Sequence, residues 1–373
     1  MTEAPASTFA IITGGGTAGH VNPALAIAAA LVAAGHAPST IHYAGSQRGI
    51  EARLVPGSGY PMTLLPGRGI QRKLAVANLR AVAGLLVAGV RALRLVRRLR
   101  PKVVIAVGGY ASVAVGLAAV VWRVPLVVAE QNIAPGAANR LLARFAKATA
   151  VAFPGTPLPR AVVTGNPIRE DISALRPERD RAAARRACGV GEGRQLLLVF
   201  GGSLGARRLN DAVLEALPIW HDRADLAVHH VVGRRDWEAV CAATPEHLGV
   251  LEYRAVIYED NMPVALAGAD LAVSRAGSST CFELAAAGLP AVLVPSPSVT
   301  ADQQTRNADH LVDVGAAVLV TDRDLDGVRL AAEVNALLAD DDRRSAMGAA
   351  ARTRARPEAA AGIAALAIEH SRG

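Results

Sequence analysis

The strongest constraint on the fold of this chain is one local pattern that occurs four times. A short apolar run leads into a glycine-rich turn, and a helical stretch follows; the turns lie at residues 14–19, 108–110, 201–205 and 275–279. Short apolar runs that alternate with helices suit buried parallel strands, because parallel strands need a crossover between them. The alternation runs through both halves of the chain, so it predicts two doubly wound α/β domains that face each other across a cleft.

Length and proline placement locate the boundary between these domains. A chain of 373 residues is long enough for about two domains. Prolines cluster before residue 168, as expected of a linker: Pro154, Pro157, Pro159 and Pro167. We therefore expect one domain over residues 1–167 and a second over residues 168–354. The helical tail, residues 355–373, is expected to pack back on the first domain.

Composition narrows the class of partner. A net charge of +8 favours nucleic acid, anionic lipid or a phosphorylated substrate. No aromatic-plus-basic pattern of an RNA-binding module is present, so we expect no nucleic-acid partner. Cys188, Cys241 and Cys281 lie far apart without metal-ligand spacing, which argues against a disulfide framework or a zinc site. The start of the chain, Met1 to Phe9, lacks the pattern of a secretory signal.

Two segments bear on a membrane. Residues 103–122 carry no charge and are about long enough to cross a bilayer. The Gly108-Gly109-Tyr110 turn divides them, so a buried strand followed by an interior helix is favoured. The helix expected over residues 78–99 has apolar side chains beyond one core-facing stripe, together with arginines that include Arg80. It could lie on an anionic membrane surface, or it could be an ordinary packed helix with a solvated arginine face.

The fourth junction has the residues best suited to a phosphorylated ligand. An apolar run, residues 271–273, leads into Gly277 and two serines, and a helix follows that carries Glu283. Backbone N–H groups at the start of a helix are unpaired and lie at the positive end of its dipole, which favours phosphate. Glu283 could then hold sugar hydroxyls, as acidic residues hold ribose elsewhere. A serine-capped helix with a solvated glutamate is the alternative.

The first junction, residues 14–20, leads into a helix expected over about residues 22–34, and it resembles a dinucleotide-binding fingerprint only in part. Its glycines permit positive φ and a close approach of backbone to ligand. A nicotinamide dinucleotide site requires an acidic residue about 20 positions further on, where Thr40, Ile41 and His42 stand instead, at the start of a strand expected over residues 41–44. A nicotinamide cofactor is therefore disfavoured.

Six segments together resemble the MurG family, the undecaprenyl-diphospho-muramoylpentapeptide N-acetylglucosaminyltransferases of glycosyltransferase family 28. They are residues 15–20, 108–110, 130–132, 165–169, 201–206 and 274–304, in the family's order and spacing over nearly the whole chain. The resemblance implies the GT-B fold, two Rossmann-like domains with a deep cleft. It also implies inverting transfer of GlcNAc from UDP-GlcNAc to the C4 hydroxyl of MurNAc in lipid I, which forms lipid II for peptidoglycan synthesis.

The resemblance further implies a location and partners. The protein would be peripheral, at the cytoplasmic face of the bacterial plasma membrane, where it would meet lipid I on an anionic surface. Proteins of cell-wall synthesis or cell division would be further partners. No cofactor and no catalytic metal are implied, although a divalent cation could help the lipid diphosphate bind.

By position, the resemblance implies a role for each site residue. Ser203 and the backbone near Ser279 and Thr280 would hold the donor diphosphate, and Glu283 would hold the ribose. Arg169 and the backbone near Glu259 would lie by the uracil. The GlcNAc hydroxyls would be bound by four further side chains: Asn132, Ser278, Gln303 and Gln304. Thr17, Ala18 and Gly19 would also belong to the UDP-GlcNAc site and would close the cleft from the acceptor side. The acceptor and membrane side would also include Gly16, Arg68, Arg72, Lys73, Arg80 and Tyr110.

Direct inversion requires a general base near the acceptor hydroxyl and stabilisation of the departing diphosphate. We expect helix-start N–H groups to provide the stabilisation. His20 is the first candidate base and Glu130 is the second, although His20 could instead tie its loop to neighbouring residues.

Two departures from the family pattern matter. Serines precede Thr280 where the family often has Ala-Leu, which leaves the backbone N–H groups in place. Ala129 stands where the family often has a histidine, so no role of that histidine applies here.

Three alternatives remain at this point: another GT-B glycolipid glycosyltransferase, a UDP-GlcNAc 2-epimerase, and a non-catalytic nucleotide-sugar sensor. An epimerase needs no acceptor, so it gives no reason for the basic and apolar region around residues 67–100. A sensor gives no reason for polar residues on both sides of the expected cleft.

Overall fold

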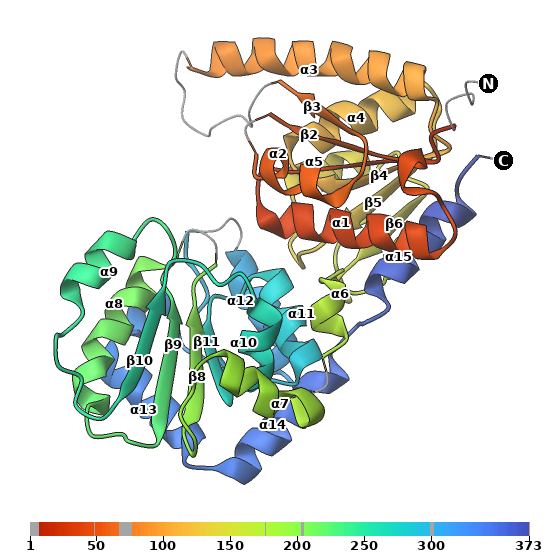
Figure 1. Ribbon diagram of the computed structural model, residues 1–373. Coiled ribbons are helices and arrows are strands. Elements are labelled where there is room, and N and C mark those ends of the chain that lie inside the picture. Colours follow the sequence, from red (N-terminus) through yellow and green to blue (C-terminus); the bar gives the residue numbers. More distant parts are fainter. Residues whose placement is uncertain are drawn as a thin grey trace. The chain divides into compact units, whose positions relative to one another are not determined.

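The computed structural model describes residues 7–47, 49–66, 77–175, 177–202, 205–298 and 302–372. The chain divides into two compact units (Figure 1). One unit consists of Met1–Arg169 and Arg356–Gly373, and the other consists of Glu170–Ala355. The boundary that we expected, at Pro167, lies just before this division.

The first unit is built on a seven-stranded parallel sheet in the order β3-β2-β1-β4-β5-β6-β7. Its strands are β1 (Ala10–Gly14), β2 (Ile41–Ser46), β3 (Met62–Leu65), β4 (Val103–Gly108), β5 (Leu126–Glu130), β6 (Ala148–Val151) and β7 (Ala161–Val163). The strand order reverses between β1 and β4. In doubly wound sheets this switch point is where ligands bind, outside the carboxyl ends of the strands.

Helices cover both faces of this sheet because successive strand residues point to opposite sides. Ile12 and Ile105 pack in a core with α1 (Ala18–Ala33) and α15 (Ala359–Glu369), which lie side by side (Figure 1). Ile11 and Val104 pack on the other side with α3 (Ala77–Leu99), α4 (Tyr110–Val121) and α5 (Ala137–Leu142). The short helix α2 (Glu51–Leu54) follows β2, and 3-10 turns span Pro38–Thr40 and Pro56–Ser58.

The second unit is built on a six-stranded parallel sheet in the order β10-β9-β8-β11-β12-β13. Its strands are β8 (Gln195–Phe200), β9 (Leu226–Val231), β10 (Glu252–Val256), β11 (Leu271–Ser274), β12 (Ala291–Leu293) and β13 (Ala317–Leu319). Its helices are α6 (Glu170–Ser173), α7 (Pro177–Ala187), α8 (Arg207–Ala216), α9 (Trp237–Ala243), α10 (Met262–Gly268), α11 (Ser278–Ala287), α12 (Gln303–Val312), α13 (Gly327–Leu338) and α14 (Asp341–Thr353), with 3-10 turns at Leu217–Trp220 and Asp322–Asp324. Leu197, Val273 and Trp220 form a core on one face with α8 and α13.

The two parallel sheets confirm the doubly wound prediction, and residues 103–122 form β4, a glycine turn and α4 as favoured. Among the described residues, no helix combines the length and apolar character needed to cross a bilayer. One boundary was wrong: α1 begins at Ala18, not near Asn22, so His20 lies in the first turn of the helix and not at the end of a loop. The strands β3, β6 and β10 were missed. β3 is only four residues long, and β10 is partly buried and carries Glu252 and Arg254, so neither forms a long apolar run.

Candidate functional site

Both sheets place the predicted site residues at the carboxyl ends of adjacent strands. In the first unit, the turns after β1 and β4 are neighbours, and the Glu130 segment ends β5 beside them. In the second unit, the turns after β8, β11 and β12 follow neighbouring strands. Each unit therefore brings its described glycine turns and the polar residues next to them together on one edge, as expected for open α/β sheets.

In the first unit, two glycine turns lie against each other. Gly15 donates its N–H to the carbonyl oxygen of Gly108 at 3.3 Å. Gly109 has a φ of +86°, and a Cβ there would lie 2.6 Å from the carbonyl oxygen of Gly15. Only glycine permits both this conformation and this approach. The contact fixes the chain path that leads into α1.

His20 lies in the first turn of α1, beside both glycine turns. Its Nδ1 is 3.3 Å from Oγ1 of Thr17, and a Cβ at Gly108 would lie 2.9 Å from its Nε2. Burial lowers the pKa of His20 below the usual 6.5, while Glu130, a hydrogen bond with the Gly15 backbone and the charge of Glu51 act in the opposite direction. The imidazole is therefore neutral at pH 7, which is the form that a general base requires.

Glu130 is better explained as the residue that holds the loop after β5. It is 4% exposed, and its oxygens accept the N–H groups of Asn132 at 2.9 Å and Gly136 at 3.0 Å. They also accept Nδ2 of Asn139 at 2.9 Å. A carboxylate that takes a substrate proton would have to give up some of these hydrogen bonds. Of the two predicted bases, His20 is therefore the stronger candidate.

The remaining first-unit predictions divide by what the structure describes. Gly16, Thr17 and Gly19 are exposed at the start of α1. Tyr110 donates its hydroxyl to the carbonyl oxygen of Leu65 at 3.0 Å. Ala18 and Arg80 belong to described helices, but their side chains lie outside what the structure describes. Arg68, Arg72 and Lys73 lie wholly outside the described residues.

In the second unit, the predicted donor residues gather at the start of α11. Gly277 precedes the helix in an extended conformation, and its carbonyl oxygen accepts the N–H of Cys281 at 3.0 Å. Ser278 is buried, and Ser279 and Thr280 are half-buried. Glu283, also half-buried, follows on the second turn. A ten-residue helix presents its N–H groups and positive dipole end here, which suits an anionic ligand.

Two predicted glutamines belong to the segment beside this helix. Gln304 accepts the N–H of Ser296 through Oε1 at 2.8 Å, so its side chain spans the loop before α12. Gln303 is the first residue of α12, and Asp302 before it has a φ of +49°. Asn307 reaches from α12 to the carbonyl oxygen of Ala276 at 3.5 Å. The contact of Asn307 places α12 beside the turn that leads into α11.

The other donor-side predictions are placed less directly. Ser203 lies outside the described residues. Glu259 accepts Nε2 of His229 at 2.8 Å and the N–H of Asn261 at 2.8 Å, so its carboxylate orders the loop after β10. Arg169 ends the first of the two chain segments that form the first unit and stands directly before α6. The role of these residues at a uracil stays a prediction.

Sequence reasoning missed two residues that shape the first-unit site. Glu51 is a fully buried carboxylate that accepts the N–H of Gly16 at 2.9 Å. Asn139 holds Glu130, as described above. Glu51 follows the carboxyl end of β2. Open α/β sheets bind ligands beyond the carboxyl ends of their strands, so this position could have identified Glu51 as a site residue, as it applies to Glu130 after β5. It was missed because the strand was expected to end at Ala44, whereas it runs to Ser46.

Within the described ranges, no group of three or more His, Cys, Asp or Glu residues could hold a metal ion.

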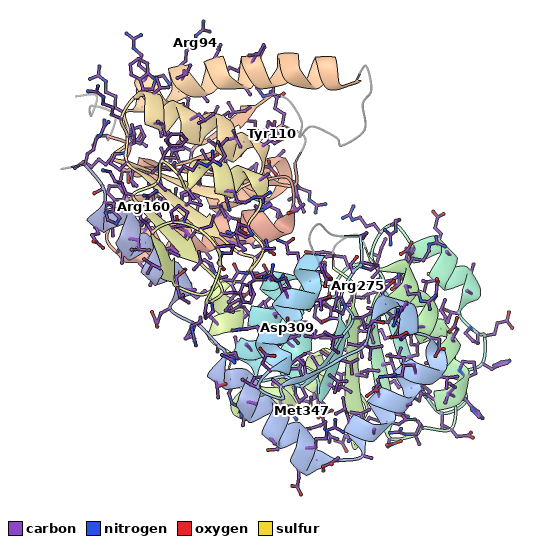
Figure 2. All side chains as sticks on the ribbon, turned by 180° about the vertical axis from the view of Figure 1, so that it is seen from behind. Arg94, Tyr110, Arg160, Arg275, Asp309 and Met347 are labelled. Atoms are coloured by element: carbon purple, nitrogen blue, oxygen red, sulfur yellow. The ribbon has the colours of Figure 1, made fainter. Side chains whose placement is uncertain are left out.

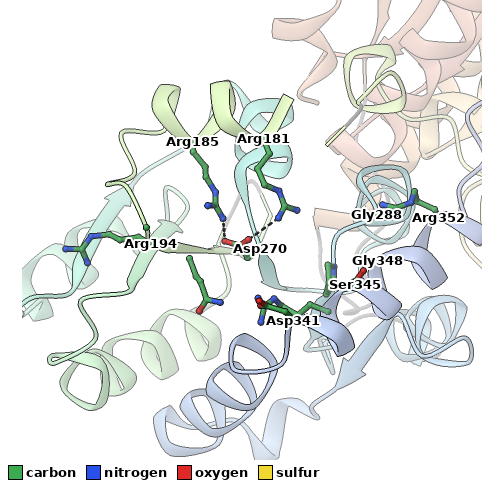
Figure 3. Close-up of a pocket in the computed structure, with 13 residues that line it drawn as sticks. Arg181, Arg185, Arg194, Asp270, Gly288, Asp341, Ser345, Gly348 and Arg352 are labelled. Carbon is green, nitrogen blue, oxygen red and sulfur yellow. Dashed lines mark hydrogen bonds and ion pairs between the residues drawn. The ribbon is translucent and has the colours of Figure 1, made fainter. Parts of the chain in front are cut away.

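A cavity of about 670 Å³ in the second unit is lined by charged residues (Figure 3). It lies near the amino ends of β8 and β11, opposite the edge that carries the donor residues. Asp270 there accepts Arg181 at 3.1 Å and the N–H of Leu196 at 2.7 Å, and it also pairs with Arg185. This ion-pair cluster fastens α7 to the sheet.

Comparison with known proteins adds independent findings. Residues 10–151 match the N-terminal domain of glycosyltransferase family 28, and residues 196–363 match its C-terminal domain. The UDP-N-acetylglucosamine--N-acetylmuramyl-(pentapeptide) pyrophosphoryl-undecaprenol N-acetylglucosamine transferase of Methylococcus capsulatus is 41% identical over 365 residues, which cover 97% of this chain and 98% of the relative.

Solved structures agree on the fold. The crystal structure of Acinetobacter baumannii MurG has a TM-score of 0.75 and 29% identity, covering 97% of this chain and 99% of that one. A UDP-GlcNAc 2-epimerase from Neisseria meningitidis, bound to UDP-GlcNAc, has a TM-score of 0.66 at 11% identity, with 97% and 99% covered. The second likeness is one of fold alone, so the fold by itself does not separate a transferase from an epimerase.

Proposed function

This chain belongs to glycosyltransferase family 28 and has the GT-B fold, and we propose from that premise that it transfers GlcNAc from UDP-GlcNAc to the muramyl sugar of lipid I, forming lipid II. The observation that carries the proposal is the 41% identity, over nearly the whole of both chains, with a transferase named for this reaction. The arrangement of the site supports it, because each sheet edge collects residues suited to one of the two substrates.

On the acceptor side, the proposed reaction uses the first unit. The C4 hydroxyl of MurNAc attacks the anomeric carbon of GlcNAc while the bond to UDP breaks on the opposite face, so the configuration inverts. His20, neutral at pH 7, accepts the hydroxyl proton. Thr17, whose hydroxyl lies beside the imidazole, helps to orient the ring. General-base catalysis of this kind contributes roughly 10²–10⁴-fold to the rate.

On the donor side, the proposed reaction uses the start of α11. The helix dipole and the N–H groups near Ser279 and Thr280 stabilise the charge that develops on the departing diphosphate. Glu283 accepts hydrogen bonds from the ribose hydroxyls, and Gln303 and Gln304 bind those of GlcNAc. In this proposal, the fixed dipoles, and not a resident metal cofactor, stabilise the negative charge on the leaving UDP.

We propose that the protein docks on the anionic cytoplasmic surface of the bacterial membrane through α3. Its described part carries exposed apolar and basic side chains together. Leu86 is 68% exposed and Val90 is 47% exposed, and Arg94 projects outward from the helix (Figure 2). The guanidinium of Arg97 lies 5.5 Å from the ring centre of Trp122, at the end of α4. Apolar groups flanked by arginines suit a helix that lies in the headgroup region.

Cell-wall synthesis or division proteins are proposed as further partners, because the product is a cell-wall precursor.

The function is tested by incubating the protein with labelled UDP-GlcNAc and a short-chain lipid I analogue. Transfer of label to the lipid is expected. Epimerisation or hydrolysis of the donor without lipid would support an epimerase or a hydrolase. Binding of the donor without any reaction would support a sensor.

Membrane docking is tested separately by co-sedimentation with phosphatidylglycerol vesicles. Leu86→Glu should release a large part of the protein from the vesicles, because it places a negative charge in the apolar contact. Val328→Glu is the matched control: Val328 is 71% exposed and lies on α13 of the second unit. Equal binding by both variants would contradict the assignment of α3.

A further inference from the structure

A buried carboxylate beneath the first glycine turn has no part in the reaction as proposed so far. Glu51 is 0% exposed. Its Oε2 accepts the N–H of Gly16 at 2.9 Å, and its Oε1 accepts the N–H of Ser46 at 2.7 Å. Burying a carboxylate is costly unless hydrogen bonds compensate for the lost water. The carboxylate therefore links the turn after β1 to the end of β2.

The chain makes room for this carboxylate at three glycines. A Cβ at Gly15 or Gly49 would overlap the carboxylate itself. A Cβ at Gly45 would lie 2.7 Å from Cγ of Glu51 and 2.9 Å from Cε1 of Tyr43. Contacts this short do not occur for real Cβ atoms, so any side chain at these positions would displace Glu51. The turn after β1 and the stretch from the end of β2 to α2 are thus both shaped around one side chain.

The same turn is held at two other points. Tyr43 donates its hydroxyl to the carbonyl oxygen of Gly14 at 2.8 Å, within the core. Gly15 bonds to Gly108, as described above. Gly16, next in the chain, has a φ of +94°. Thr17 follows it and is the residue directly before α1. Glu51 therefore fixes the residue at which the chain turns into the helix that carries His20.

We propose that Glu51 is a positioning residue for glycosyl transfer: its buried carboxylate holds the Gly14–Thr17 turn, and through it the imidazole of His20, in the place from which the acceptor hydroxyl is deprotonated. The inference rests on the proposed function. It has a corollary for the acceptor. Because Glu51 occupies the N–H of Gly16, an acceptor diphosphate would bind to later amides of the turn.

The first test is Glu51→Gln, which keeps the size of the side chain. An amide removes the negative charge and replaces one acceptor with a donor, so one of the two backbone N–H groups loses its partner. We expect kcat with the lipid I analogue to fall about 10–100-fold, as is common when a residue that orients an active group is lost. The dissociation constant for UDP-GlcNAc, measured by calorimetry, should change much less than kcat, because the residues proposed to hold the diphosphate and the ribose belong to the second unit.

A second measurement separates positioning from simple stability. The negative charge of Glu51 raises the pKa of His20. Its removal should therefore move the acid limb of kcat, and the NMR titration of the His20 ring, to lower pH. The matched control is Asp270→Asn, which also alters a buried carboxylate that accepts a backbone N–H. It should lower the melting temperature without moving the His20 titration.

Gly45→Ala displaces Glu51 while keeping its charge. Its kcat should fall, whereas Gly57→Ala should behave as the wild type, because a Cβ at Gly57 meets nothing within 4 Å. If Glu51→Gln fails to fold, this pair decides the question.

The proposal is overturned if Glu51→Gln keeps wild-type kcat and an unmoved His20 titration, or if Gly45→Ala and Gly57→Ala have the same kcat. Absence of transfer by the wild-type protein would instead overturn the proposed function. The NMR titration needs no substrate, so it still reports on Glu51 in that case.

Discussion

The two units place the same strand–turn–helix junction in opposite electrostatic settings. The turn at residues 14–17 rests on the buried carboxylate of Glu51. The turn at residues 275–277 carries Arg275, which donates to the carbonyl oxygen of Val294 at 3.1 Å and pairs with Asp322 at 2.5 Å. The charge of Glu51 disfavours an anion at the N–H of Gly16, whereas the guanidinium beside the second turn, although paired with Asp322, does not disfavour one. A shared backbone motif therefore does not imply a shared ligand, and the fixed charges around each turn divide the roles.

The largest effect that tests this division is expected from His20→Ala. Loss of the base should lower kcat by about 10²–10⁴-fold. The dissociation constant for UDP-GlcNAc should stay near the wild-type value, because the proposed diphosphate and ribose contacts belong to the second unit. Calorimetry and a lipid I transfer assay measure the two quantities. His221→Ala, at an exposed histidine, is the control. Near-normal turnover by His20→Ala would remove this residue as the base.

Glu283→Ala is expected to have the converse effect. Loss of hydrogen bonds from a charged acceptor to ribose should cost about 1.5–3 kcal/mol, which weakens UDP-GlcNAc binding by roughly 10–100-fold. Glu238→Ala, at an exposed glutamate of α9 in the same unit, is the matched control. An unchanged dissociation constant in Glu283→Ala would refute the ribose assignment.

A smaller effect is expected from pH. Burial lowers the pKa of His20 below 6.5, so the imidazole loses its proton at lower pH than an exposed histidine would. The activity that depends on neutral His20 is therefore present above the lowered pKa and is lost as the pH falls through it. At pH 6.5, kcat should exceed half of its maximum, as measured from pH 5 to 8. A midpoint above 6.5 would contradict His20 as the base.

The smallest effect is expected from chelation. If helix dipoles stabilise the departing diphosphate, EDTA should change kcat by less than about twofold with a short-chain acceptor. The assay is run at a saturating concentration of lipid, so that any effect of a divalent cation on acceptor binding is suppressed. Complete loss of transfer, restored by Mg²⁺, would show that a metal has the role assigned to the dipoles.

Local patterns predicted the parts of the fold that depend on local physics. Residues 103–108 and 110–121 separate into strand and helix because Gly108 and Gly109 adopt positive φ, at +123° and +86°. The start of α1 was misplaced, because Gly16 turns the chain sharply and Pro23 within the helix obscures its beginning. Glu130 was found as a site residue, but its role as the acceptor for a whole loop follows only from contacts with Asn132, Gly136 and Asn139.

The sequence by itself determined the alternation of strands, glycine turns and helices in each half, and so the parallel character of the two sheets, because apolar periodicity and glycine conformation act over a few neighbouring residues. Only the tertiary structure decided which carboxylate supports which turn. Glu51 meets Gly16 across 35 positions of the chain, after β2 has paired with β1. The burial that lowers the pKa of His20 arises in the same way, since it depends on segments that come together only when the sheet has formed.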